Sequence, residues 1–253
     1  MQRREFLKQS WAASLLTGAV PRLARAQAAR APAAGKMRVL CWSERTEPAN
    51  VYPQGINGAI AGFLRRSADL DVRTASINDG EQGIGKAAID ATDVLVWWGH
   101  LKHKDIDDAH VAEVIRQIRE RGLGFIGLHS TQGAKVFTGA LGCSGEIGGW
   151  REDGKREFLK CVAPSHPIAQ GLGDFTLAQT EMYNEPFQVP PPEKTIFFSY
   201  WEGGEQFRSC NVWSAGKGRV VYFRPGHESF PIYHQELPLR VVKNSVTWCA
   251  SRS

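Results

Sequence analysis

The chain has 253 residues, of which 42 % are hydrophobic and 23 % charged, so it is long enough to bury one large core as a globular protein. Its net charge is +5 and its sequence pI is near 9.0, but residues 1–28 hold five basic groups and one acidic group, which is +4 of that total. The remainder therefore carries only about +1, which removes the electrostatic argument for nucleic acid as a partner.

The first 28 residues have the order of a twin-arginine export signal. Arg3 and Arg4 precede the apolar run "WAASLLTGAV", and "ARAQA" then places small residues as a signal peptidase requires. The run is far shorter than the roughly 20 residues that span a membrane, which favours a cleaved signal over an anchor. We therefore predict a signal peptide at 1–28, a linker at 29–36 and a single domain at 37–253, exported to the periplasm by the twin-arginine machinery without remaining on the membrane.

The domain begins with strands that alternate with amphipathic helices. Strands are predicted at 37–42, 70–76, 93–98 and 123–129, and helices at 56–67 and 108–122. Strands that are apolar on both faces, separated by such helices, indicate a doubly wound α/β fold with a mostly parallel sheet. The second half is less regular, with inserted strands and loops. Its predicted elements are strands at 156–164, 194–201, 208–216 and 218–226 and a final helix at 235–250.

Three of the seven histidines follow predicted strands. His100 follows "VLVWWG", His129 ends "GFIGLH", and His227 follows "RVVYFRPG". Ligands of open α/β sheets bind at the carboxyl ends of the strands, so three strand ends can bring three imidazoles to one crevice. A histidine at the end of a single strand is more often a hydrogen-bonded core or turn residue, and that interpretation stays open for each one.

Imidazole is the commonest neutral ligand of divalent transition metals. We therefore predict a site for Zn²⁺, Mn²⁺ or Fe²⁺ that is held by His100, His129 and His227. In "TEMYNEPF", Glu181 and Glu185 are predicted to supply a carboxylate ligand or a catalytic base, and His129 is itself a candidate catalytic group.

Several other side chains are candidates for contact with a small-molecule substrate. The chain has eight tryptophans, and an aromatic face near a strand end can stack on a sugar, although core packing is the commoner role for each one. Of the remaining histidines, His103 could be a ligand, His110 is expected at the surface and His166 is expected to cap a turn. The predicted substrate contacts are Trp98, Ser130, Tyr183, Arg224 and His234. The five cysteines have no metal or disulfide spacing and are expected to be mostly buried apolar residues.

The motifs "DVLVWWGHLKH", "GFIGLHS", "EMYNEPF", "FFSYWEGGEQFRS" and "GKGRVVYFRPGHESFPIYH" together resemble the ThuA-like (trehalose utilisation) family from about Met37 to Ala250. The resemblance implies a flavodoxin-like fold similar to class I glutamine amidotransferases. Where those enzymes have Gly-x-Cys-x-Gly at a nucleophile elbow, this chain has Gly127-Leu128-His129-Ser130-Thr131. The missing thiol excludes their Cys–His chemistry. His227 and Glu228 resemble the His-x-Glu pair of those enzymes, with the acid one residue closer.

The resemblance further implies catabolism of trehalose or related disaccharides through 3-keto sugars. We expect a metal-dependent enzyme that acts on a keto-sugar or 3-keto glycoside by elimination, hydrolysis or isomerisation through an enediolate. A periplasmic carbohydrate-binding protein without catalysis is the alternative. A serine hydrolase that uses Ser130 is disfavoured because the Gly-x-Ser-x-Gly pattern is absent.

Overall fold

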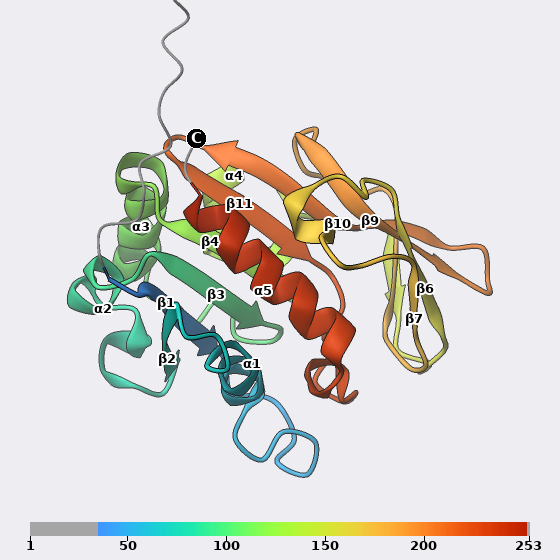
Figure 1. Cartoon of the computed structure of the whole chain (residues 1–253), viewed down its shortest axis with the longest axis horizontal. Coiled ribbons are helices and arrows are strands. Elements are labelled where there is room, and N and C mark those ends of the chain that lie inside the picture. Colours follow the sequence, from blue (N-terminus) through green and yellow to red (C-terminus); the bar gives the residue numbers. More distant parts are fainter. Residues whose placement is uncertain (1–34, 252–253) are drawn as a thin grey trace, which may run out of the picture.

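The computed structural model describes residues 35–251 of the chain (Figure 1). The predicted export signal and residues 29–34 of the predicted linker lie outside this range. Among the helices inside it, none combines the length and apolar character that a membrane span requires. All five cysteines lie inside it and are free, and Cys41, Cys210 and Cys249 are buried as expected.

A nine-stranded mixed sheet runs through the molecule. Its strands, in spatial order, are β2 (Leu70–Ser76), β1 (Met37–Ser43), β3 (Val94–Gly99), β4 (Gly124–His129), β11 (Gly218–Phe223), β10 (Gln206–Ala215), β9 (Lys194–Trp201), β6 (Glu157–Cys161) and β7 (Phe175–Leu177). The first five in this order pair in parallel, and the other pairs are antiparallel. The first strand in the sequence, β1, lies inside the sheet, and later strands are added on both sides of it. This order confirms the doubly wound, mostly parallel α/β class.

The parallel strands are covered by helices on both faces. These helices are α1 (Ile56–Leu64), α2 (Lys86–Asp90), α3 (Asp108–Arg116), α4 (Lys135–Leu141) and α5 (Glu236–Ala250). Successive side chains of a strand point to opposite faces. Val39 of β1 therefore joins the core under α1 and α5, whereas Leu40 joins the core under α3 and α4. This double burial explains why the strands are apolar throughout rather than alternating.

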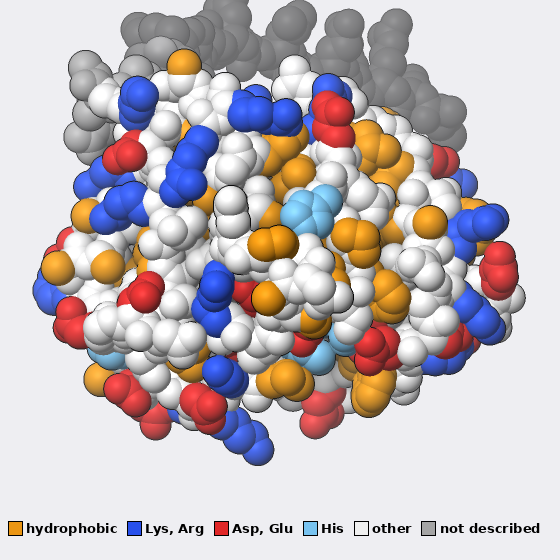
Figure 2. All heavy atoms as spheres, turned by 90° about the horizontal axis from the view of Figure 1, so that it is seen from below, with side chains coloured by type: hydrophobic (Ala, Val, Ile, Leu, Met, Phe, Trp, Pro, Cys, Tyr) orange, Lys and Arg blue, Asp and Glu red, His pale blue; other side chains and the backbone are white. Residues whose placement is uncertain are grey.

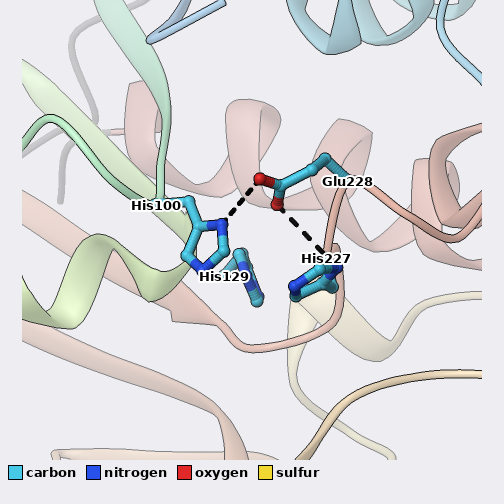
Figure 3. A group of neighbouring side chains, drawn as sticks. All are labelled: His100, His129, His227 and Glu228. Atoms are coloured by element: carbon cyan, nitrogen blue, oxygen red, sulfur yellow. Dashed lines mark hydrogen bonds and ion pairs between the residues drawn. The ribbon is translucent and has the colours of Figure 1, made fainter. Parts of the chain in front are cut away.

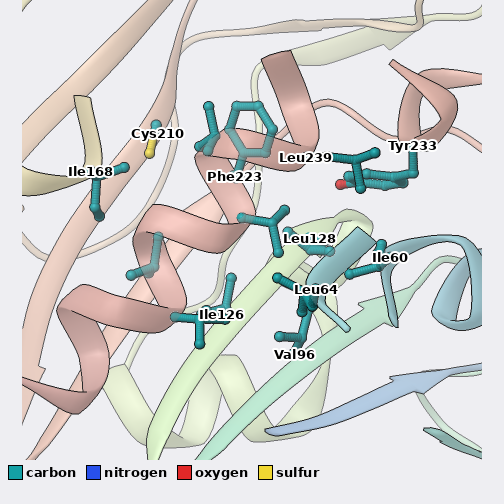
Figure 4. Packing of buried hydrophobic residues seen from close by; sticks show 14 of the residues in the cluster. Ile60, Leu64, Val96, Ile126, Leu128, Ile168, Cys210, Phe223, Tyr233 and Leu239 are labelled. Atoms are coloured by element: carbon teal, nitrogen blue, oxygen red, sulfur yellow. The ribbon is translucent and has the colours of Figure 1, made fainter. Parts of the chain in front are cut away.

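The helix α5 crosses in front of β4 and β11 in Figure 1 and packs its apolar side on them. In Figure 4, Leu239 of α5 lies in one cluster with Leu128 of β4 and with Ile60 and Leu64 of α1. Burying each aliphatic side chain of this kind stabilises the fold by about 1.5–3 kcal/mol. The predicted helix at 108–122 is α3 followed by a π-helical turn, Gln117–Arg121, which ends at Gly122 with φ 86°.

The second half of the chain inserts the antiparallel strands, as the sequence predicts for β6, β9 and β10. A separate two-stranded sheet joins β5 (Gly149–Arg151) to β8 (Met182–Asn184). The elements that the sequence did not predict are α2, α4, β5, β7 and β8. Each is only three to seven residues long, which is too short to show a periodicity.

The carboxyl ends of the central parallel strands meet at one edge of the sheet. β4 ends at His129, β3 ends one residue before His100, and β11 ends four residues before His227. The three predicted strand ends are therefore correct. Seen from below the view of Figure 1, histidine side chains reach the surface among hydrophobic ones (Figure 2).

Candidate functional site

The imidazole of His129 stands at a sharp turn. His129 has φ 55° and ψ −126°, a combination that side-chain-bearing residues rarely adopt and that costs about 1–3 kcal/mol. The turn is tight because a Cβ at Gly127 would lie 2.9 Å from Thr131 Cγ2, while Thr131 Oγ1 donates to the Leu128 carbonyl at 2.6 Å. The strained backbone thus presents the side chain at the end of the strand.

Three imidazoles surround one point at this edge of the sheet. The ring centroids of His100, His129 and His227 are 4.9 to 5.2 Å apart, and the rings meet edge to face. One ligand atom from each ring and one carboxylate oxygen of Glu228 all lie within 4.8 Å of one another. Figure 3 shows the four side chains turned toward a common centre. We call these four residues the histidine cluster.

Glu228 orients the first of these rings. Its Oε1 lies 2.7 Å from His100 Nδ1, a hydrogen bond that places the ring proton on Nδ1 and leaves the lone pair of Nε2 available. Burial lowers the pKa of His100, but this bond and the negative charges of nearby glutamates together outweigh burial, so the pKa is raised above its usual value. Burial raises the pKa of Glu228, but the same bond and the charges of His100 and His227 together outweigh burial and lower it.

His129 is fully buried, and neither of its ring nitrogens has a hydrogen-bond partner among the described residues. Burial, reinforced by the charges that His100 and His227 can carry, lowers its pKa well below the usual value, so the ring is neutral. Burying an unpartnered polar atom costs about 1–3 kcal/mol. A cation would satisfy the one ring nitrogen that carries the lone pair, while the N–H nitrogen would still need an acceptor. Three imidazoles with a carboxylate form a donor set that fits Zn²⁺, Mn²⁺ or Fe²⁺.

His227 completes the cluster from the loop after β11. Its Nδ1 accepts the Ser229 N–H at 3.2 Å, so the neutral ring carries its proton on Nε2, which lies 3.6 Å from Glu152 Oε2. To bind a cation, this ring would have to give up the Ser229 contact. Burial lowers the pKa of His227. A second carboxylate, Glu152, therefore approaches the cluster from its open side.

A third carboxylate lies beneath His129. Glu181 Oε2 is buried and lies 3.6 Å from His129 Nε2, which is too long for a hydrogen bond. It has no hydrogen-bond partner in the part of the chain that the structure describes. Burial raises the pKa of Glu181 to about 7, although Arg224 opposes this shift. The group can therefore hold or release a proton near neutral pH.

A buried carboxylate behind the cluster fixes the loop that carries His100. Glu44 follows β1, is fully buried, and its Oε2 accepts the N–H groups of His100, Leu101 and Lys102 at 2.7 to 2.8 Å. Its Oε1 lies 3.0 Å from His103 Nδ1. Burial raises the pKa of Glu44, but His103 and the loop amides outweigh it and lower the pKa, so the carboxylate is charged.

The sequence of this chain matches a known protein family. Residues 38–249 match the family described as ThuA, trehalose utilisation. The chain belongs to the ThuA family. The match confirms the resemblance inferred from the motifs and supports a role in carbohydrate metabolism. A comparison with curated protein sequences gave no match.

Solved structures share the ThuA-family fold. A ThuA-like protein from Bacteroides uniformis has 14 % identity and a TM-score of 0.58, over 86 % of this chain and 93 % of its own. A glutamine amidotransferase from Thermotoga maritima has 15 % identity and a TM-score of 0.51 over 76 % of each chain. A GMP synthase protein from Thermoplasma acidophilum has 11 % identity and a TM-score of 0.51, over 85 % of this chain and 95 % of its own. Such low identities establish the fold alone.

Four predicted site residues of this ThuA-family chain need correction. Glu185 is held by Arg208, whose Nε donates to Oε1 at 2.8 Å, so Glu185 is neither ligand nor base of the histidine cluster. Trp98 is fully buried and donates to the Gly226 carbonyl at 2.9 Å, with its ring parallel to that of His129, so it supports that ring and offers no face to a sugar.

The other two corrections concern Arg224 and His234. Arg224 is fully buried and forms an ion pair with Glu157, so it cannot reach a substrate. His234 stacks on Tyr52 and lines a separate groove between α1 and the start of α5, which includes no residue of the histidine cluster. By contrast, Ser130 and Tyr183 lie beside His129, with their hydroxyl oxygens 2.5 Å apart, and their contact with a substrate stays a prediction.

Three candidate residues of the site, Glu228, Glu44 and Glu152, were not predicted from the sequence. Glu228 was noted only for its resemblance to the acid of the His-x-Glu pair in glutamine amidotransferases. Glu44 lies two residues after the predicted strand 37–42 and directly after the observed β1, so the rule applied to the histidines would have found it. Glu152 lies in a loop without a recognisable motif and could not have been found in this way. His166 accepts the Ile168 N–H at 3.2 Å, as the predicted capping role requires.

Proposed function

We propose that this ThuA-family protein is a periplasmic, metal-dependent enzyme that acts on a 3-keto glycoside or related keto-sugar. The observation that carries the proposal is the histidine cluster, in which neither buried ring nitrogen of His129 has a hydrogen-bond partner within residues 35–251. Three imidazoles and a carboxylate exceed what hydrogen bonding to a sugar requires, and they match the ligands of a catalytic transition metal. The family description, trehalose utilisation, supports a sugar as the substrate.

The residues divide into two roles. His100, His129 and His227 would hold the cation, with Glu228 as an additional ligand or as the group that orients His100. When bound, the cation would supply Lewis-acid stabilisation of the negative charge that develops on the C3 oxygen of the substrate. Glu44 keeps the His100 loop in place, and Glu181 has the only carboxylate oxygen directed at His129 that is free of other contacts among the described residues.

Glu181 is the general base of the proposed reaction. Its Oε2 would accept the C2 proton, which the neighbouring carbonyl acidifies. The electron pair of the C2–H bond first forms the C2=C3 double bond of an enolate, with the negative charge on the C3 oxygen. The C3 carbonyl then re-forms, the C1=C2 double bond is made, and the bond from C1 to the glycosidic oxygen breaks. The departing oxygen takes a proton, and the two sugars separate by elimination. An isomerase would share the first step and return the proton to a different carbon.

The metal is tested first, on full-length protein purified without chelator or nickel. We expect about one divalent transition metal per chain, retained in H166A but lost in H129A. His166 is a matched control because it lies in a turn outside the histidine cluster. If elemental analysis finds no metal, and added Zn²⁺, Mn²⁺ or Fe²⁺ does not raise the melting temperature, the metal-dependent enzyme is rejected.

The reaction is tested by incubation with 3-keto-trehalose in D₂O. Exchange at C2 with release of glucose supports elimination, and exchange without release supports isomerisation. In E181Q both should fall by at least about 100-fold, because general-base catalysis contributes a factor of this order. No exchange and no consumption in the wild type reject both reactions. Metal-independent binding of unmodified trehalose would then make the carbohydrate-binding protein the better interpretation.

A further inference from the structure

Leu101 and Trp150 are the two most exposed large hydrophobic side chains of the described residues. Leu101, 67 % exposed, directly follows His100, and Trp150, 65 % exposed, lies in β5. The other exposed large hydrophobic side chains, which are Phe158, Val162, Tyr200 and Leu237, are only 39 to 44 % exposed. Single exposed hydrophobic side chains are common on protein surfaces, so the direction in which Trp150 faces decides whether it has a binding role.

The pairing of β5 with β8 shows which way Trp150 faces. Trp150 lies directly opposite Tyr183 in this antiparallel pair, so the two side chains project from the same face of the small sheet. The ring of Tyr183 is 5.8 Å from the ring of His129, and its hydroxyl contacts Ser130. The face that carries Trp150 is therefore the face directed at the histidine cluster.

The neighbours of Trp150 in sequence support this direction. Arg151 points to the opposite side, where it pairs with Glu205 of the β9–β10 turn and with Asp153. Glu152, two residues after Trp150, returns to the first side and reaches to 3.6 Å from His227 Nε2. Arg151 thus anchors the strand, while Trp150 and Glu152 line the open side of the cluster.

We propose that Trp150 is the stacking platform for a sugar ring at the mouth of the histidine cluster. This inference rests on the proposed function and adds the subsite that holds the second sugar. A pyranose ring presents a face of C–H groups that packs on an aromatic ring while its hydroxyls stay in water. Because Trp150 lies outside the buried imidazoles, it holds the departing sugar of a glycoside and not the ring that reacts.

The test compares W150A, W150F and the wild type, with Y200A as the control for loss of an exposed aromatic elsewhere. With 3-keto-trehalose, W150A should raise KM about tenfold, a typical contribution of an aromatic contact, with kcat and metal content unchanged. The KM values of W150F and Y200A for 3-keto-trehalose should stay within about threefold of the wild-type value. With the monosaccharide 3-keto-glucose, KM of W150A should match the wild type.

An unchanged KM of W150A for the disaccharide overturns the inference, and so does an equal loss with the monosaccharide. If the wild type turns over neither compound, the proposed function fails, and calorimetric titration with trehalose tests Trp150 separately. Tighter binding by the wild type than by W150A then supports the platform, whereas equal affinity or no binding rejects it. Loss of self-association in W150A with unchanged sugar affinity would assign the residue to a contact between copies and also rejects the platform.

Discussion

Two buried polar clusters lie side by side in this protein, and they differ in how their atoms are satisfied. The first is the histidine cluster. The second, which we call the arginine network, consists of Arg224, Glu157, Thr180, Ser199 and Ser209. Arg224 links the two, because its Nη1 donates to the Glu181 carbonyl at 2.6 Å.

In the arginine network, almost every polar atom has a partner within the chain. Glu157 accepts from Arg224 with one oxygen and from Ser199 with the other, and among the described residues only Arg224 Nε of this network lacks a hydrogen-bond partner. In and beside the histidine cluster, both ring nitrogens of His129 and one oxygen each of Glu228 and Glu181 have no hydrogen-bond partner within residues 35–251. Buried polar groups are nearly always paired. The comparison indicates that the arginine network maintains the fold, whereas the unpaired atoms of the histidine cluster support the ligand site proposed above.

The largest expected effect concerns the arginine network. Changing Glu157→Ala leaves a buried guanidinium without its counter-charge, which should lower the free energy of unfolding by about 3–5 kcal/mol. Urea denaturation of the variant and of the wild type measures the difference. E157Q, which keeps the hydrogen bond to Ser199, should lose less. A loss below about 1 kcal/mol in E157A would remove the distinction between the clusters.

The second prediction uses the protonation of Glu181 in metal-free protein. Burial raises its pKa from 4.5 to about 7 in the folded state, so folding favours the protonated form. The resulting stabilisation is complete below pH 4.5 and is lost as the pH rises to about 7. By linkage it amounts to about 3 kcal/mol.

The measurement is the free energy of unfolding of wild type and E181Q between pH 4 and pH 8. The wild type should lose stability relative to E181Q across this window, because glutamine does not titrate. Parallel curves for the two proteins would contradict the shifted pKa.

The third prediction concerns the support behind the histidine cluster. E44A removes the acceptor of three amide groups in the loop of His100, so metal affinity should fall about tenfold or more. E44Q retains a carbonyl oxygen at this position and should recover most of the affinity, as measured by calorimetric titration with Zn²⁺. If E44A binds Zn²⁺ as tightly as the wild type, Glu44 does not position His100.

The smallest expected effect is the strain at His129. H129G and H129A both remove the imidazole, but only glycine adopts φ 55° without steric cost. H129G should therefore be more stable than H129A by about 1 kcal/mol, after allowance for the extra entropy of glycine in the unfolded chain. Thermal unfolding of the two variants without metal decides this, and a less stable H129G would show that the turn is not strained.

The sheet can be predicted from the sequence because a strand that is buried on both faces is apolar at successive positions. Val39 and Leu40 face different helical layers, so both must be apolar, and the same holds along β3 and β4. The same double burial explains the error at Trp98. Once a strand is covered on both faces, a tryptophan at its end is enclosed by the core and is not presented to a substrate.

By itself, the sequence determined the alternation of strands and helices and the placement of three histidines at strand ends, since both depend on neighbouring residues. Only the tertiary structure decided which carboxylates join them. Glu185 is drawn away by Arg208 of β10, while Glu228 meets a ring 128 residues earlier in the chain. The face of the small sheet from which Trp150 projects is set by the pairing of β5 with β8, in which Trp150 lies opposite Tyr183. Such contacts join residues that are distant in sequence, and their energies depend on packing and burial that no local pattern records.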